Sequence, residues 1–262
     1  MKRLGPVLVL IIILFIQLSG CKDKEVTNNK APKPPLKSSV TPSTNKQLLN
    51  GKLWPPIPKE GEMGGLSENL LIKNYYVVLD GSGSMQGVGC SGSMTKSEAS
   101  KKALVTFSES VPADDNLGLA AFDSRGVTER VPLGINNREN FVAKVKATLA
   151  NSNTPLRDAV MLGYKKLEEQ ASRQLGYGEY HLVIVTDGVA SPGQDPTAIV
   201  NHIIDSTPIV IHTIGFCIGA EHALNQAGRT DYKTADSPQE LVHGLKGVLA
   251  EAEEYDMSEF GQ

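Results

Sequence analysis

The chain has 262 residues, of which 40% are hydrophobic and 21% are charged, a balance typical of a soluble globular body. Its formal net charge is -3, and only 5% of its residues are aromatic. A basic surface and aromatic platforms for stacking bases are therefore not expected, so nucleic acid is excluded as a partner.

The first 20 residues have the order of features found in a secretory signal peptide. Lys2 and Arg3 precede an apolar run over 7–16, and Leu18-Ser19-Gly20-Cys21 follows it. The cysteine after Ser-Gly resembles a bacterial lipobox, which implies cleavage before Cys21 and acylation of that residue, with palmitate among the acyl groups. A membrane-spanning anchor is the alternative, but the apolar run is shorter than the roughly 20 residues that cross a bilayer.

We therefore predict a lipid-anchored protein of the cell envelope. Lys22 stands directly after the lipidated cysteine, where an Asp is associated with retention in the inner membrane. The outer membrane is slightly favoured for this reason. Residues 21–73 are rich in Lys, Asn, Pro, Ser and Thr and are predicted to form a largely disordered tether, on which Trp54 is a candidate to dock against the following domain.

Residues 74–257 are predicted to form one domain in which strands alternate with helices. Apolar runs without alternation indicate strands that are covered on both faces. In chain order we expect a strand at 75–79, a helix at 96–110, a strand at 117–122, an alternating antiparallel strand at 127–133, helices at 140–150 and 155–175, a strand at 180–188, a helix at 195–205, a strand at 208–216, a short helix at 220–227, a weak edge strand at 230–235, and a last helix from the capping Ser237 to about 255. This order predicts an α/β fold with a mostly parallel central sheet flanked by helices.

Oxygen-bearing side chains follow the ends of the predicted strands. Asp80 and Asp187 each end a strand, Ser82 and Ser84 follow the first of them, and Thr154 stands just before a helix. Because the carboxyl ends of parallel strands meet at one edge of a sheet, these side chains should converge. Such a set suits a hard divalent cation, Mg²⁺ or Mn²⁺, and it lacks the His and Cys ligands that zinc prefers.

The pattern Asp-x-Ser-x-Ser, then a distant Thr, then a distant Asp, resembles the metal-ion-dependent adhesion site of the von Willebrand factor A (VWA) family. The resemblance covers roughly 74–255 and implies a Rossmann-like VWA domain. It implies that Ser82 and Ser84 bind the metal directly, that Thr154 does so directly or through water, and that Asp80 and Asp187 act mostly by orienting waters and hydroxyls. It also implies an open metal position that an acidic side chain of a protein partner can take.

The expected function is therefore binding of a protein partner at the envelope, without enzymatic activity. One alternative is a structural or assembly factor in which the metal only stabilises the loops, and another is a subunit that supports an enzyme complex. The residues present do not match the patterns of common catalytic sites. The glycine-rich loop lacks a Gly-Lys-Ser/Thr ending, a dication would keep Asp80 and Asp187 ionised, and His181 and His212 lie inside strands.

Two cysteines remain once Cys21 carries lipid. Cys90 lies in a long loop after the first strand and Cys217 follows the strand at 208–216, so both belong to the carboxyl edge of the sheet. Two separate thiols are possible, but in an exported protein we predict a disulfide. Asp123 and Arg125, in the turn after the second strand, are candidates for partner specificity on the same rim.

Overall fold

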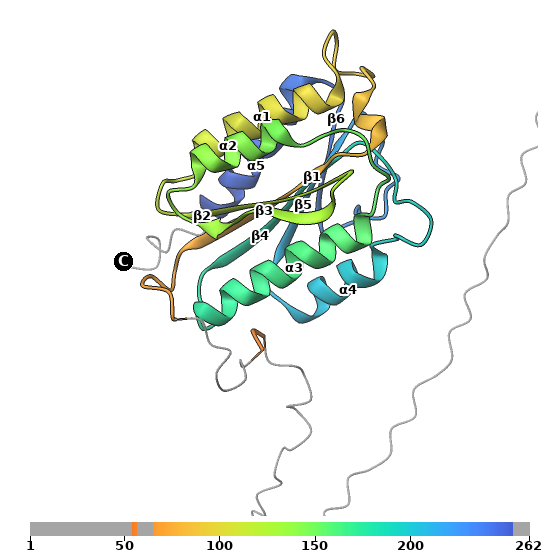
Figure 1. The fold of residues 1–262 in the computed structure, drawn as a ribbon. Helices are drawn as coiled ribbons and strands as arrows, with labels where there is room; N and C mark the ends of the chain where they lie inside the picture. Colours follow the sequence, from red (N-terminus) through yellow and green to blue (C-terminus); the bar gives the residue numbers. More distant parts are fainter. Residues whose placement is uncertain (1–53, 57–64, 254–262) are drawn as a thin grey trace, which may run out of the picture. The chain divides into compact units, whose positions relative to one another are not determined.

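The computed structural model describes residues 54–56 and 65–253 (Figure 1). The signal peptide, Cys21 and most of the predicted tether lie outside the described residues, and their assignments stay predictions. Within the described part of the chain, no helix is both long enough and apolar enough to cross a membrane.

The domain is built on a single sheet of six strands in the order β3-β2-β1-β4-β5-β6. Neighbouring strands run parallel except β3, which is antiparallel to β2. The predicted mostly parallel sheet is thus confirmed. The strands are β1 (Lys73–Asp80), β2 (Asn116–Asp123), β3 (Gly126–Gly134), β4 (Glu179–Thr186), β5 (Val210–Phe216) and β6 (Asp231–Ala235).

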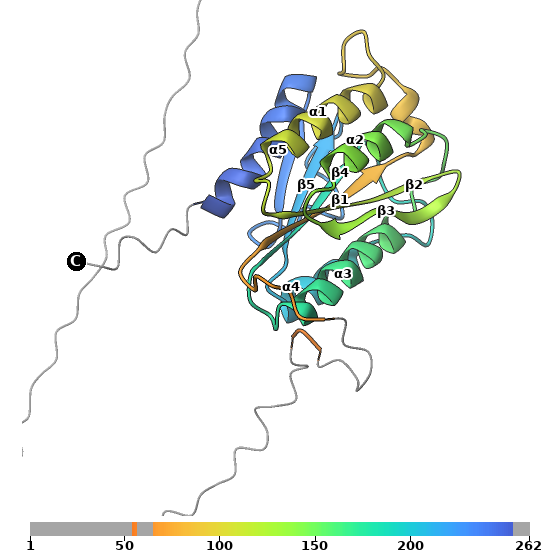
Figure 2. The same ribbon diagram turned by 60° about the vertical axis from the view of Figure 1, so that its left-hand side comes forward.

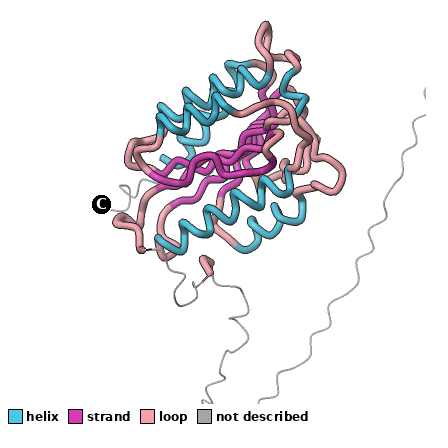
Figure 3. The backbone as a smooth tube through the Cα atoms, in the orientation of Figure 1, coloured by secondary structure: helices cyan, strands magenta, loops and turns pink. Residues whose placement is uncertain are grey.

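Five α-helices cover both faces of this sheet (Figures 1 and 3). One layer contains α1 (Lys96–Ser110), α2 (Arg138–Ala147) and α5 (Pro238–Glu253), and the opposite layer contains α3 (Leu156–Arg173) and α4 (Thr197–Ser206). The turned view separates the two layers clearly (Figure 2). At the edge of the sheet where the parallel strands end, the segment after β1 forms a loop and a short 3-10 helix, η1 (Gly83–Gln86).

The absence of alternation in the central strands follows from this two-sided covering. In β1, Tyr75, Val77 and Leu79 pack into the core under α1, α2 and α5, whereas Tyr76 and Val78 pack under α3 and α4. All five side chains are fully buried. A strand with helices on both faces needs apolar residues at every position, which is the pattern that the sequence displays.

Three local expectations can be compared directly with the structure. Helix α2 begins two residues earlier and ends three residues earlier than predicted. The predicted helix at 220–227 is wrong, since this segment consists of turns. Trp54 lies against the domain as expected, with its ring 4.9 Å from that of Tyr180 in an edge-to-face contact.

Candidate metal centre

The loop after β1 is held tightly at the carboxyl edge of the sheet. A Cβ at Gly81 would lie 2.3 Å from the carbonyl oxygen of Phe122 and 2.4 Å from that of Leu149, so only glycine fits there. The amide of Gly83 donates a hydrogen bond to the carbonyl of Ser152, at 2.8 Å. The loop is therefore fixed between the end of β2 and the segment before α3.

Asp80 is buried at the end of β1 and uses both carboxylate oxygens within the protein. One oxygen accepts a hydrogen bond from the amide of Ser82 at 2.7 Å, and the other accepts one from the hydroxyl of Thr186 at 2.6 Å. Burial raises the pKa of Asp80 to about 6, and these hydrogen bonds limit the rise. Asp80 is thus placed to orient the serine loop, and sequence reasoning did not find its partner Thr186.

Three oxygens meet beside Asp80. The hydroxyls of Ser82 and Ser84 lie 2.8 Å apart, and Oδ1 of Asp187 accepts from Ser84 at 2.7 Å and from Ser82 at 3.4 Å. In an octahedral Mg²⁺ site with bonds near 2.1 Å, neighbouring ligand oxygens lie roughly 3 Å apart. The three oxygens therefore form a triangle with the dimensions of one face of such an octahedron.

Thr154 lies close to this group but is not joined to it by a hydrogen bond of its hydroxyl. Its amide donates to the hydroxyl of Ser191 at 3.0 Å, and its carbonyl accepts from the amides of Leu156 and Ser191. The segment that contains it pairs with the serine loop through a bridge between Ser82 and Ser152. Of the five predicted residues, the structure thus brings four into one hydrogen-bonded network and places the fifth in the adjoining loop.

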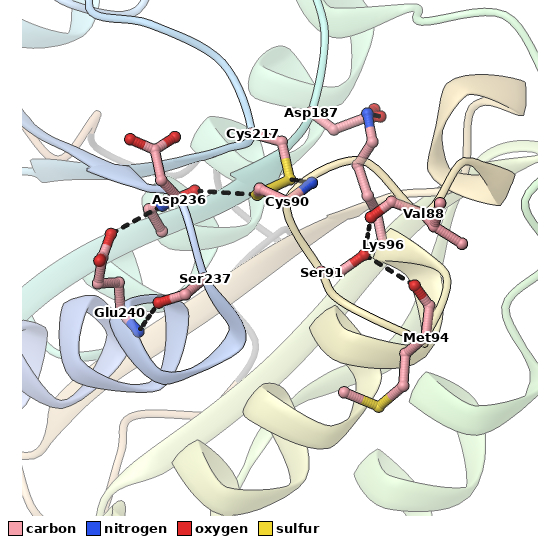
Figure 4. The surroundings of a disulfide bond; sticks show 11 residues. Val88, Cys90, Ser91, Met94, Lys96, Asp187, Cys217, Asp236, Ser237 and Glu240 are labelled. Atoms are coloured by element: carbon pink, nitrogen blue, oxygen red, sulfur yellow. Dashed lines mark hydrogen bonds and ion pairs between the residues drawn. A yellow bond between two sulfur atoms is a disulfide. The ribbon is translucent and has the colours of Figure 1, made fainter.

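Lys96 joins the same network, although the sequence did not point to it. It is the first residue of α1, and its ammonium lies 2.5 Å from Oδ2 of Asp187 (Figure 4). The Asp187 side chain is fully buried and that of Lys96 is 13% exposed. A lysine at the first position of a helix opposes the helix dipole, which is the one signal in the sequence that could have marked it.

The donor set fits a hard divalent cation. It consists of carboxylate and hydroxyl oxygens, which Mg²⁺ and Mn²⁺ prefer. Among the described residues, no cluster of three or more His, Cys, Asp or Glu side chains is placed to hold a metal ion. A metal here would depend on the serine hydroxyls as well as on the two aspartates.

A disulfide joins Cys90 to Cys217 beside this group, which confirms the predicted pairing (Figure 4). Their Cα atoms lie 5.6 Å apart, within the range that a disulfide can span. The bond ties the loop before α1 to the end of β5. The amide of Cys217 also donates to the carbonyl of Ala235, the last residue of β6, so the Cys217 end of the bond is held on the sheet.

The two residues proposed for the rim have different environments. Asp123 is buried at the end of β2, where its carboxylate accepts hydrogen bonds from Arg125, Arg130 and the amide of Leu149. Burial alone would raise its pKa, but these bonds hold the pKa of Asp123 well below its usual range. Of the pair, only Arg125 is exposed, whereas Asp123 contributes to the lining of a hollow together with residues that include Gly83, Gln86, Ser152 and Pro155.

Comparison with known proteins gives a consistent picture of the fold. Residues 74–242 match the family model of the von Willebrand factor type A domain. A von Willebrand factor type A protein from Catenulispora acidiphila superposes with a TM-score of 0.56 at 15% identity, covering 69% of this chain and 42% of that one. No curated protein matches the sequence.

Two further solved structures share this fold. The pilus adhesin SpaC from Lactobacillus rhamnosus GG has a TM-score of 0.54 at 15% identity, covering 72% of this chain and 31% of the adhesin. An aerotolerance-related membrane protein from Bacteroides fragilis has a TM-score of 0.53 at 13% identity, covering 69% of the present chain and 99% of that protein's chain. The present chain spans only about a third of the length of the adhesin.

Proposed function

The chain belongs to the von Willebrand factor type A domain family, and we propose that it binds a protein partner at the cell envelope through Mg²⁺ or Mn²⁺. Domains of this family are generally interaction modules and not enzymes. The observation that carries the proposal is the triangle of oxygens from Ser82, Ser84 and Asp187 at the carboxyl edge of the sheet.

Each residue of the proposed site has a distinct task. Ser82, Ser84 and Thr154 supply neutral hydroxyl ligands, whereas Asp80 holds the serine loop through the amide of Ser82. Asp187 supplies negative charge and orients both serine hydroxyls. A cation in such a site supplies an open position that a carboxylate from a partner can occupy.

The surface around the site supports a protein as the occupant. Val88 is 52% exposed in the disulfide-bonded loop, and Val189 is 72% exposed two residues after Asp187. We propose that a protein partner covers these two apolar side chains. Arg125, in the turn after β2, is exposed and forms an ion pair with the buried Asp123. We therefore propose a partner that presents an acidic side chain flanked by apolar residues.

The envelope location is proposed from the lipobox at Cys21, with the outer membrane favoured. Two structural neighbours have related settings, since one is a pilus adhesin and another is a membrane protein. A lipid anchor followed by a polar segment would present the domain at a membrane surface without a spanning helix.

The test combines calorimetry with partner capture. We expect the purified chain to bind Mg²⁺ or Mn²⁺ at millimolar concentration or below, and Ser84→Ala to weaken binding by about tenfold or more because it removes one oxygen of the triangle. Ser93→Ala, in the same loop region, removes an exposed serine and is the matched control.

Capture of envelope proteins is then compared in Mg²⁺ and in EDTA. A partner retained in Mg²⁺ and released both by EDTA and by Ser84→Ala supports a metal-bridged contact. The same partners in all conditions would contradict it and favour a structural role for the site. Absence of metal binding by the wild-type chain at millimolar concentrations would overturn the metal site itself.

A further inference from the structure

We propose that Lys96 is a built-in cation of the metal site, which weakens metal binding by the isolated domain and leaves more positive charge available for an acidic partner. The inference rests on the proposed function and deepens it. It starts from the contact between the ammonium of Lys96 and Oδ2 of Asp187, at 2.5 Å.

The two oxygens of Asp187 are divided between two kinds of partner. Oδ1 accepts from the hydroxyls of Ser82 and Ser84, whereas Oδ2 is held by Lys96. The lysine thus offsets the charge of this carboxylate through the oxygen that the serine hydroxyls do not contact. Because Asp187 is fully buried and Lys96 is nearly so, water screens the pair only weakly.

The loop over 87–91 is shaped around the lysine side chain. Gly89 has a φ of +44°, and a Cβ there would lie 3.1 Å from Cε of Lys96 and 3.4 Å from Sγ of Cys217. The amide of Lys96 donates to the carbonyl of Gly87 at 2.8 Å. The lysine stem therefore lies next to Gly89, whose other neighbour is Sγ of Cys217 in the disulfide, and this leaves the stem little freedom to change its position.

The charges near the site explain what this arrangement does. Asp80 and Asp187 together carry up to two negative charges, and Lys96 offsets one of them. A dication then enters a site with about one net negative charge. It binds less tightly than it would to a site with two negative charges, and the occupied site retains more net positive charge. A partner carboxylate supplies the missing negative charge, so metal and partner are expected to strengthen the binding of each other.

The experiment measures Mg²⁺ binding by the purified chain in the absence of any partner. Lys96→Met removes the charge and keeps most of the stem, and Lys96→Gln is a second neutral variant if the first is poorly folded. Both are expected to bind Mg²⁺ at least about tenfold more tightly than the wild-type chain. Lys96→Arg keeps the charge, and Lys102→Met removes an exposed lysine from the same helix; both should bind as the wild type does.

The sign of the effect separates this role from a purely structural one. A lysine that only held Asp187 in position would, once removed, leave a looser site and weaker binding. Unchanged or weaker Mg²⁺ binding by both neutral variants would therefore overturn the inference and leave the proposed function standing. Binding by the neutral variants alone would support the inference and contradict metal use by the wild-type chain, and binding by none of the proteins would overturn both.

Discussion

A buried pair of histidines lies between the strands, away from the metal centre. The Nδ1 atom of His181 in β4 lies 3.1 Å from Nε2 of His212 in β5, whose Nδ1 in turn lies 2.8 Å from Asp231 in β6. The ring of His181 also stacks on Tyr75 of β1, with centroids 4.8 Å apart. Each histidine of the pair thus has an acidic neighbour, since Nε2 of His181 lies 3.4 Å from the carboxylate of Glu179.

Burial, together with the nearby side chains of His212 and Lys73, lowers the pKa of His181 to about 3. Glu179, on the same strand as His181, and Lys233, which pairs with Asp231, are further charged groups near the pair. The folded state therefore holds His181 neutral, whereas the unfolded chain protonates it below a pH of about 6.5. This histidine makes the fold less stable as the pH falls from about 6.5 toward 3.

We expect this effect to appear in urea unfolding between pH 7.5 and 5. The free energy of unfolding of the wild type should fall relative to that of His181→Phe by up to about 1.4 kcal/mol for each pH unit below 6.5. Phenylalanine keeps a ring against Tyr75 but cannot take a proton. His243→Gln removes an exposed imidazole and is the control. Parallel curves for wild type and His181→Phe would contradict the assignment.

Residue patterns predicted the convergence of Asp80, Ser82, Ser84 and Asp187 because strand ends fix where their side chains emerge. The position of Lys96 could not be predicted in this way. Its reach to Asp187 depends on the path of the loop at 87–95, which is set by the glycines and by the disulfide. Spacing along the chain carries no information about such a path.

At the scale of elements, predictions succeeded where burial dominates. Central strands such as β4 are apolar throughout because both faces are covered, and α1 has a capping box in which Thr95 and Glu98 exchange hydrogen bonds. The segment at 220–227 has residues that favour helices, yet only Leu224 is deeply buried there. Side chains instead bond locally, as when Asn225 donates to the carbonyl of Ala220, and such bonds compete with a short helix.

The disulfide contributes a prediction about the stability of these elements. It closes a loop with a sequence separation of 127 residues, which contains most of the sheet. Replacing both Cys90 and Cys217 by serine should lower the free energy of unfolding by about 2–5 kcal/mol, because the unfolded chain without the bond has a higher conformational entropy. Urea unfolding with and without a reductant provides the measurement. Reductant should destabilise the wild type and leave the double variant unchanged, and equal stability of the two proteins would contradict the prediction.

At the scale of the whole molecule, the predicted attachment to a membrane would depend on Cys21, which lies outside the described residues. If Cys21 carries the lipid, Cys21→Ser should leave an uncleaved precursor or release the protein from membranes. Fractionation of cells that express each form, followed by mass measurement of the N-terminal peptide, checks this. Ser19→Ala changes a neighbouring small residue without removing the thiol and is the matched control. Unaltered processing and membrane retention of Cys21→Ser would rule out the lipid anchor.

The position of β1 has a mechanical consequence for a protein of this design. The chain enters the domain at the amino end of β1, and the loop with Ser82 and Ser84 leaves its carboxyl end. A membrane anchor at one end and a bound partner at the other would pull along the length of this strand. β1 is hydrogen-bonded to β2 on one side and to β4 on the other. A force along the strand therefore loads the hydrogen bonds of both strand pairs in shear, so that they must break together and not one after another. The path of tension would thus run through a central strand that is buried at seven of its eight positions and is expected to resist forced unfolding.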